Sequence, residues 1–329
     1  MLFFKMVLGA AIRSGFVAIF LGLLISTGCS QQVFDVIPQN QLFEAKASYN
    51  NKVDILFMID NSSSMLQHQD RLAREIEPLI KFLNSTDLDY RLAAVSSDWR
   101  PNGRGSGGKL LGSPSFLTKS TQGLVDLLKS RILLGESGTD IESGLESVQR
   151  ALQTEAGRSF LREDALLAII VLADEDDYSP GHINDYRSFL DQIKQKVPGY
   201  SRGWVLNFLG IIQLDGNCRT MNNIVEVGAR YMELARLSGG IQASICETSL
   251  SRSVANIQTR IVQILSEYPL RYPPDLSTVK VYINDRLVPQ SQTNGWWYIP
   301  ETMKIRFSGD YLPKPFDRIQ VDYKPAGGA

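Results

Sequence analysis

Apolar residues along this chain alternate between short continuous runs and longer stretches with helical spacing. Continuous apolar runs of strand length are typical of strands buried on both faces of a sheet. Apolar residues three and four positions apart are typical of amphipathic helices. The runs cover 53–59, 90–95, 165–173 and 205–213, and the helical stretches cover 72–83, 124–128, 141–152, 183–193, 224–234 and 250–264. This alternation predicts an α/β domain with a doubly wound, mostly parallel sheet.

The pattern changes on either side of this domain. Residues 29–49 are polar and have no clear period, as expected of a tether, so the domain is predicted to cover 50–268. From Pro269 onward, prolines are followed by alternating apolar residues around 279–283, 296–298, 305–307 and 319–323. This alternation predicts a small antiparallel β module over 269–329. One residue of the pair Trp296 and Trp297 is expected in its core.

Residues 1–28 have the pattern of an export signal. They contain two charges, Lys5 and Arg13, followed by an apolar core and the small residues 26–28. A small-residue run that ends in a cysteine, here Cys29, resembles the lipobox of bacterial lipoproteins, although Ser26 stands where that motif usually has leucine. The resemblance implies lipidation of Cys29 and attachment to a membrane of the bacterial cell envelope, at the outer membrane or the periplasmic face. Ordinary signal cleavage and an uncleaved anchor remain open alternatives.

Charge and loop sequence exclude two classes of ligand. The chain has 34 basic and 35 acidic residues, and removal of 1–28 with its two basic side chains gives a net charge near −3 (32 minus 35). A chain with this charge has no electrostatic footprint for nucleic acid. Residues 103–109 match much of a phosphate-binding loop, but Leu110 follows Lys109 where Ser or Thr would hold Mg²⁺, and Pro114 prevents a helix there. We therefore expect a surface loop here and no bound nucleotide.

The first apolar run ends at a carboxylate that is followed by hydroxyl side chains. Asp60, Ser62 and Ser64 place one charged and two neutral oxygens within a single tight turn. Such an oxygen set suits a hard cation such as Mg²⁺, with Mn²⁺ or Ca²⁺ as alternatives. Ser64 with Gln67 three residues later also matches a capping box, so the serines could instead satisfy the first amides of the next helix.

The run 165–173 also ends at an acid, Asp174. Parallel strands deliver the residues that follow them to the same edge of a sheet, so Asp60 and Asp174 are expected close together, where they would repel unless a cation lies between them. Thr139 lies in a Gly-Thr-Asp loop before the predicted helix 141–152 and is expected at the same edge; with Glu142 it also matches a capping box. The acids at 175–177 could add ligands to a metal through water, but they are interpreted chiefly as solvated surface charge.

Together these residues resemble the metal-ion-dependent adhesion site of von Willebrand factor type A domains. The matching residues are Asp60, Ser62 and Ser64, then Thr139, then Asp174, in that order along the chain. The resemblance covers 50–268 and implies a Rossmann-like domain that holds Mg²⁺ or a similar ion. It implies direct ligation by the two serines, and ligation directly or through water by the other three residues. The chain departs from the family pattern at residue 175, a glutamate where many members have glycine.

Two cysteines remain once Cys29 is assigned to processing. Cys218 and Cys246 flank one predicted helix, and an exported protein is exposed to oxidising conditions. The pair is therefore predicted to form a disulfide, and two buried free thiols are the alternative.

Three functional classes remain. The first is an envelope-anchored, metal-dependent protein-binding or adhesion module that captures a partner's Asp or Glu, because two carboxylates and three hydroxyls leave a position of an octahedral shell to water. The alternative is an envelope scaffold with a purely structural metal. A hydrolase is the least supported class, because the chain contains only two histidines, His68 and His182, and no nucleophile motif. We expect no enzymatic activity.

Overall fold

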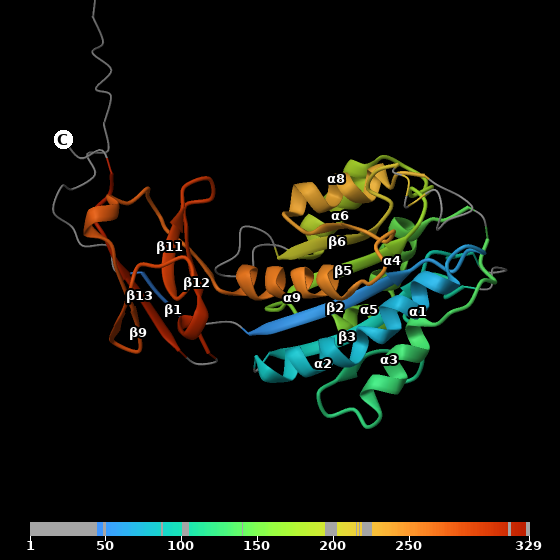
Figure 1. Ribbon diagram of the computed structural model, residues 1–329, viewed down its shortest axis with the longest axis horizontal. Coiled ribbons are helices and arrows are strands. Elements are labelled where there is room, and N and C mark those ends of the chain that lie inside the picture. The colour runs from blue at the N-terminus through green and yellow to red at the C-terminus, as the bar shows by residue number, and fades with distance from the viewer. Residues whose placement is uncertain are drawn as a thin grey trace, which may run out of the picture. The chain divides into compact units, whose positions relative to one another are not determined.

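The computed structural model describes residues 51–86, 88–100, 105–139, 141–194, 203–214, 216, 218, 226–314 and 317–326, and the backbone of 45–48. These residues form a mixed α/β domain and a smaller antiparallel β part (Figure 1). The α/β domain contains β2 (Lys52–Ile59), α1 (Leu66–Arg74), α2 (Ile76–Ser85), β3 (Asp89–Ser96), β4 (Leu117–Thr118), α3 (Leu124–Ile132), α4 (Gly144–Gln153), α5 (Glu155–Phe160), β5 (Leu166–Ala173), α6 (Ile183–Ile193), β6 (Trp204–Gly210), α8 (Ala229–Ser238), β7 (Gln242–Ser244) and α9 (Ser251–Leu265).

The central sheet has the strand order β4-β3-β2-β5-β6-β7. Its strands are parallel, except that β4 runs antiparallel to β3. From β2 the chain continues outward to β3, and from β5 it continues outward in the other direction to β6. The strand order therefore reverses between the neighbouring strands β2 and β5, which is where doubly wound sheets bind ligands. The predicted fold class is confirmed.

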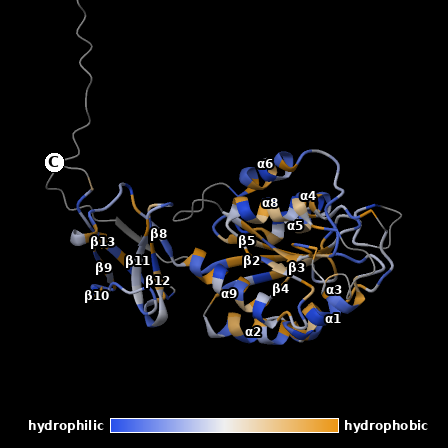
Figure 2. Cartoon of the chain, turned by 45° about the horizontal axis from the view of Figure 1, so that its top comes forward, coloured by the Kyte–Doolittle hydropathy of each residue, from blue (hydrophilic) through white to orange (hydrophobic). Residues whose placement is uncertain are grey.

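The strands of the sheet centre are buried on both faces. Val53, Ile55 and Phe57 of β2 pack in one cluster with residues of α1, α2, α3 and α9. Leu56 and Met58 of the same strand pack in a second cluster with residues of α4, α5, α6 and α8. Figure 2 shows the apolar character of the central strands between helices that combine polar and apolar residues. Burial on both sides explains why the sequence shows continuous apolar runs here and no alternation.

The stretch 72–83, predicted as one helical face, belongs to two helices. α1 ends at Arg74 and α2 begins at Ile76, with Glu75 between them. Pro78 explains the break, because it has no amide hydrogen to donate to the carbonyl of Arg74. Pro78 lies in the first turn of α2, where an amide needs no helical partner.

The helix predicted over 141–152 begins at Gly144. Its N-cap is Ser143, which makes no side-chain capping bond. The capping box considered for Thr139 and Glu142 is therefore wrong, and Glu142 lies before the helix. Gly144 packs so closely against Met58 and Tyr231 that an added Cβ would approach the Tyr231 hydroxyl to 2.3 Å. This close approach fixes the first turn of α4 against the sheet.

The antiparallel part consists of two sheets. One has the order β1-β13-β9-β10 and the other β11-β12-β8. Trp296 is 2% exposed in the shared core and Trp297 is half-buried, as predicted for the pair. Asn284 and Asp285 form the left-handed turn between β9 and β10 (φ 50° and 65°). The strands are β1 (Ala45–Ser48), β8 (Glu267–Pro269), β9 (Lys280–Ile283), β10 (Arg286–Val288), β11 (Gly295–Ile299), β12 (Lys304–Ser308) and β13 (Arg318–Asp322).

Two predicted boundaries change. β1 pairs with β13 in antiparallel register, so the tether prediction for 29–49 is wrong at Ala45–Ser48. β8 pairs with β12, so the β part begins at Glu267, before the predicted boundary at 269. The predicted export signal 1–28 and the predicted lipid attachment at Cys29 lie outside the described residues. None of the described helices combines the length and apolar character that a membrane span requires.

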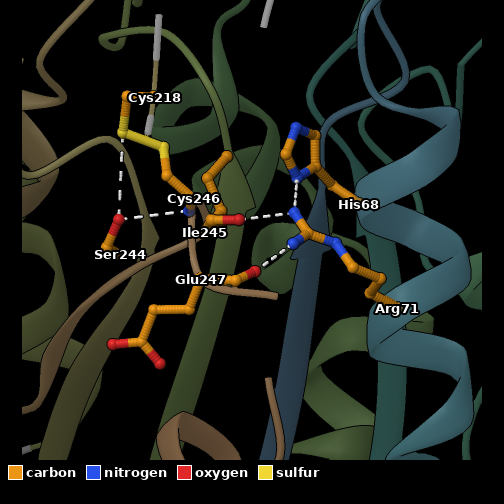
Figure 3. The surroundings of a disulfide bond; sticks show 7 residues. All are labelled: His68, Arg71, Cys218, Ser244, Ile245, Cys246 and Glu247. Atoms are coloured by element: carbon orange, nitrogen blue, oxygen red, sulfur yellow. Dashed lines mark hydrogen bonds between the residues drawn. A yellow bond between two sulfur atoms is a disulfide. The ribbon is translucent and has the colours of Figure 1, made fainter. Parts of the chain in front are cut away.

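Cys218 and Cys246 form a disulfide, as predicted. Both side chains are buried, with their Cα atoms 4.9 Å apart. Arg71 of α1 donates hydrogen bonds to the carbonyls of Ile245 and Glu247 on either side of Cys246 (Figure 3). The disulfide segment is therefore attached to the helix that follows the loop 60–64.

Candidate metal centre

The two strands at the reversal of the sheet each end at an aspartate. Ile59 of β2 is in register with Leu172 of β5, and the amide of Asp60 donates to the carbonyl of Leu172 (3.0 Å). Asp60 and Asp174 are both fully buried at this edge. The sheet thus brings together two acids that are far apart in sequence, as predicted from the strand ends.

The loop after β2 folds back on Asp60. One oxygen of Asp60, Oδ1, accepts hydrogen bonds from the amide of Ser62 (2.8 Å) and the hydroxyl of Ser97 (3.2 Å). The hydroxyls of Ser62 and Ser64 lie 3.3 Å apart. The next helix begins at Leu66, and its N-cap residue makes no side-chain capping bond. The capping role considered for Ser64 is therefore wrong, and the serine oxygens face the acids.

Gln69 of α1 holds this loop against a neighbouring one. Its side-chain amide donates to the carbonyls of Asp60 (2.8 Å) and Gly135 (3.0 Å), and its side-chain oxygen accepts from the amide of Gly135 (2.9 Å). Gly138 donates to the carbonyl of Asn61 (2.7 Å), and an added Cβ at Gly138 would come within 2.6 Å of that carbonyl. The segment 135–138 therefore lies directly beside the loop that carries Asp60.

A third acid, Glu142, joins Asp60 and Asp174. One carboxylate oxygen from each of the three residues lies within 4.8 Å of the others, and this trio is the group with metal-ligand character among the described residues. Glu142 is 1% exposed. From the sequence, Glu142 is predicted only as the second residue of a capping box with Thr139, because the predicted helix 141–152 includes it. A helix start predicted at Gly144 would place Glu142 in the loop beside Thr139, and so among the candidate ligands.

Most oxygens of this trio have no hydrogen-bond partner of ordinary geometry among the described residues. These oxygens are Asp60 Oδ2 and both carboxylate oxygens of Glu142 and Asp174. Buried carboxylates without partners are costly, because each has lost its water. A hard divalent cation removes that cost, and the donor set of carboxylate and hydroxyl oxygens is the one that Mg²⁺, Mn²⁺ or Ca²⁺ accepts. The residues present therefore fit such an ion.

Burial and mutual repulsion shift the protonation of the three acids. Burial, followed by the charge of Asp60, raises the pKa of Asp174 to about 7, and the Ser64 hydroxyl offsets part of that rise. The same two causes raise the pKa of Glu142 far above its usual range. Burial also raises the pKa of Asp60. Raised pKa values favour the protonated forms of these groups, so metal and protons compete for the same oxygens.

Thr139 has a different environment from the other four predicted ligands. It is half-buried, and its hydroxyl donates to the carbonyl of Ile141 (3.4 Å). None of its hydrogen bonds among the described residues connects it to Asp60 or Asp174. Ligation by Thr139 therefore stays a prediction, while Glu142 occupies the place near the acids.

Two of the three acids at 175–177 are not solvated surface charge. Glu175 is 7% exposed and Asp177 is 3% exposed, so that interpretation is wrong for both. Asp177 accepts from the amide of Leu145 (3.0 Å) and the hydroxyl of Ser179 (2.7 Å), and Ser179 in turn accepts from the amide of Glu146 (2.8 Å). The segment after β5 therefore satisfies the first amides of α4, which explains why the helix needs no capping residue of its own.

Comparisons with known proteins were made on sequence and on structure. No protein-family model and no curated protein matches the chain. It is similar to a von Willebrand factor type A protein from Catenulispora acidiphila (12% identity, TM-score 0.38, over 87% of this chain and 68% of that one). It is also similar to the pilus adhesins SpaC from Lactobacillus rhamnosus GG (11%, 0.42, 86% and 40%) and RrgA from Streptococcus pneumoniae (11%, 0.37, 85% and 58%). The chain thus spans between 40% and 68% of the length of these proteins.

Proposed function

We propose that this protein is a divalent-metal-dependent protein-binding module that captures a carboxylate of a partner protein. Asp60, Asp174, Ser62 and Ser64 would hold the ion, with Thr139 as a further ligand directly or through water. The ion would supply a positive centre at this edge of the sheet, to which a partner's carboxylate could bind. No catalytic step is part of the proposal.

The observation that carries the proposal is the set of unpartnered carboxylate oxygens at the reversal between β2 and β5. Three buried acids converge there, and five of their oxygens have no hydrogen-bond partner of ordinary geometry among the described residues. An arrangement of this kind is stable only when the charge is removed by protons or by a cation. An oxygen-rich donor set at the ligand-binding edge of a doubly wound sheet supports the cation.

Exposed apolar side chains near the acids support a protein as the partner. Leu66 follows the loop of Ser62 and Ser64 and is 45% exposed. Ile141, beside Glu142, is 57% exposed, and Tyr178, whose amide donates to the carbonyl of Glu142 (2.7 Å), is 49% exposed. Exposed apolar side chains next to a charged centre are typical of protein interfaces.

The proposal includes a location at the bacterial cell envelope. The disulfide between Cys218 and Cys246 supports export, because such bonds persist in oxidising compartments. Attachment through a lipid on Cys29 would hold the module at a membrane. Mass spectrometry of the mature N-terminus tests this part, since a lipid-modified Cys29 is expected as the first residue, and an unmodified start elsewhere would remove the anchor from the proposal.

Glu142 favours a second candidate, a scaffold with a purely structural metal. Three carboxylates carry more negative charge than a divalent ion neutralises, so a site that retains all three has little affinity for a fourth. In that case the ion would stabilise the fold, and a partner would bind elsewhere.

One experiment separates the two candidates. Immobilised mature protein is exposed to envelope extract in Mg²⁺, in chelator, and in chelator with Mg²⁺ restored, next to an Asp60→Ala variant. Mg²⁺ affinity of both proteins is measured by calorimetry. The proposed function requires a partner that is lost with chelator, regained with Mg²⁺, and absent from the variant. If both proteins retain the same partner equally under all conditions, while the wild type still binds Mg²⁺, the scaffold with a structural metal is the supported function.

A further inference from the structure

We propose that Glu142 is an internal occupant of the metal centre. Its carboxylate takes the coordination position that a partner's carboxylate requires, and it leaves that position when a partner binds. The inference rests on the proposed function, because it assigns how the partner reaches the ion. Glu142 is thereby a regulatory residue that keeps the centre closed in the absence of a partner.

The position of Glu142 carries the first step. A carboxylate oxygen of Glu142 lies within 4.8 Å of oxygens from both Asp60 and Asp174, which are near enough to share one ion. The side chain is 1% exposed, and neither of its oxygens has a hydrogen-bond partner of ordinary geometry among the described residues. A buried carboxylate with one oxygen this close to two other acids is placed to ligate a cation.

Charge carries the second step. Asp60 and Asp174 alone balance a divalent ion, and Glu142 adds one negative charge beyond that balance. A partner's carboxylate would add another, which the buried site disfavours strongly. The partner's carboxylate therefore replaces Glu142, and the total charge around the ion stays the same. A centre with three acids can therefore still capture a partner, because the partner's carboxylate takes the place of the Glu142 carboxylate.

The local backbone permits the exchange. Glu142 precedes α4, which begins at Gly144, so its carboxylate can move without unwinding the helix. The backbone at this point is held by bonds from Tyr178 to the carbonyl of Glu142 (2.7 Å) and from Ser143 to the carbonyl of Ser97 (3.3 Å). A change of side-chain torsions moves the carboxylate while these bonds remain. Ile141 beside it is 57% exposed, so the segment borders solvent.

Water-proton relaxation with bound Mn²⁺ tests the inference, because it counts the waters on the ion. If Glu142 joins two carboxylates and two serine hydroxyls, about one of six positions is left to water, and its removal roughly doubles the water on the ion. Wild type, Glu142→Ala and Glu142→Gln are compared, with Glu175→Gln as the control that removes a neighbouring buried charge. Acetate is the carboxylate probe, and thermal melts confirm that each variant is folded.

We expect both Glu142 variants to bind Mn²⁺ about tenfold more weakly than wild type and Glu175→Gln. Their bound Mn²⁺ should relax water protons about twice as strongly, and acetate should lower that relaxation in the variants at concentrations that leave wild type unchanged. Equal relaxation and equal acetate response in wild type and both Glu142 variants would overturn the inference, while leaving the metal centre intact. Absence of Mn²⁺ binding by wild type would overturn the proposed function itself.

Discussion

The amide of Asp60 donates a 3.0 Å hydrogen bond to the carbonyl of Leu172, so β2 and β5 stay in register up to their last residues. Both strands then end, and the first residue after each strand is an aspartate: Asp60 after β2 and Asp174 after β5. Because the pairing continues to the edge, the separation of the two acids is set by the sheet itself. A site built in this way does not depend on a bound ion for its assembly.

A first prediction concerns the contrast between Asp174 and Asp177. Neither oxygen of Asp174 accepts a hydrogen bond of ordinary geometry from a described residue, so Asp174→Asn should abolish Mg²⁺ binding and leave the metal-free protein equally or more stable. Asp177 accepts bonds from Leu145 and Ser179 and lies 3.4 Å from Arg230, so Asp177→Asn should cost about 1–3 kcal/mol. Urea unfolding in chelator measures both. Destabilisation by Asp174→Asn as large as that by Asp177→Asn would contradict the assignment.

A second prediction concerns pH. The pKa of Asp174 is raised from 3.8 to about 7, so between these values the folded protein holds a proton that the unfolded chain has released. Metal-free stability should therefore fall as pH rises through this window, and the raised pKa of Glu142 extends the decline above it. Saturating Mg²⁺ should remove the decline, because the ion binds the deprotonated acids. Urea unfolding across the window, with chelator or with Mg²⁺, checks the sign. Metal-free stability that rises from pH 5 to pH 7 would refute it.

Most of the fold could be predicted because its signals are local. Residues 183–193 show apolar spacing along one helical face, and α6 has these bounds. The four buried strands of the sheet each differ from the predicted runs by a few residues at their ends. The division between α1 and α2 also had a local signal in Pro78, which the apolar spacing alone does not include.

The candidate site was predictable in part. Asp60 and Asp174 follow directly from strand ends, because parallel strands fix where the next residue lies. Glu142 and Asp177 depend on how one loop packs against another, and their carboxylates are placed by contacts between segments more than thirty residues apart, as in the bond from Leu145 to Asp177. Sequence spacing contains no information on such contacts. The same limit explains why the buried acid Asp177 was interpreted as surface charge.

A third prediction concerns the disulfide. Replacement of Cys218 and Cys246 together by serine should lower the free energy of unfolding by about 3 kcal/mol, because the bond closes a loop with a sequence separation of 28. Chemical denaturation of the double variant against the oxidised wild type measures the difference. Peptide mapping of the unreduced protein should recover the two cysteines linked. Recovery of both as free thiols would show that the bond does not form.

A fourth prediction concerns Arg71, which attaches α1 to the disulfide segment (Figure 3). Arg71→Met keeps the length of the side chain but leaves the carbonyls of Ile245 and Glu247 without this donor. The loss should cost about 2 kcal/mol, since both acceptors lie beside a buried segment. Arg74→Met on the same helix is the matched control, because Arg74 is exposed. Similar stability of the two variants in urea would show that the contact does not contribute.

The last prediction concerns the apolar side chains beside the acids. Ile141 and Tyr178 are 57% and 49% exposed, so Ile141→Ser and Tyr178→Ala should change the free energy of unfolding by no more than about 0.5 kcal/mol. Ile141 has no ligand atom and the Tyr178 hydroxyl donates to Glu226, so Mg²⁺ affinity measured by calorimetry should stay at the wild-type value. Metal-dependent partner binding should nevertheless weaken about tenfold, because large apolar residues near the centre of an interface carry much of its energy.

Leu276→Ser provides the control for this prediction. Leu276 is 46% exposed and lies in the antiparallel β part. Its replacement should change neither the Mg²⁺ affinity nor the binding of the partner. We expect Ile141→Ser and Tyr178→Ala to lose partner binding while they still bind the ion, which would separate the two functions. If these variants bind the partner as well as Leu276→Ser does, the partner contacts the ion without its apolar surroundings, and the surface beside Glu142 does not select it.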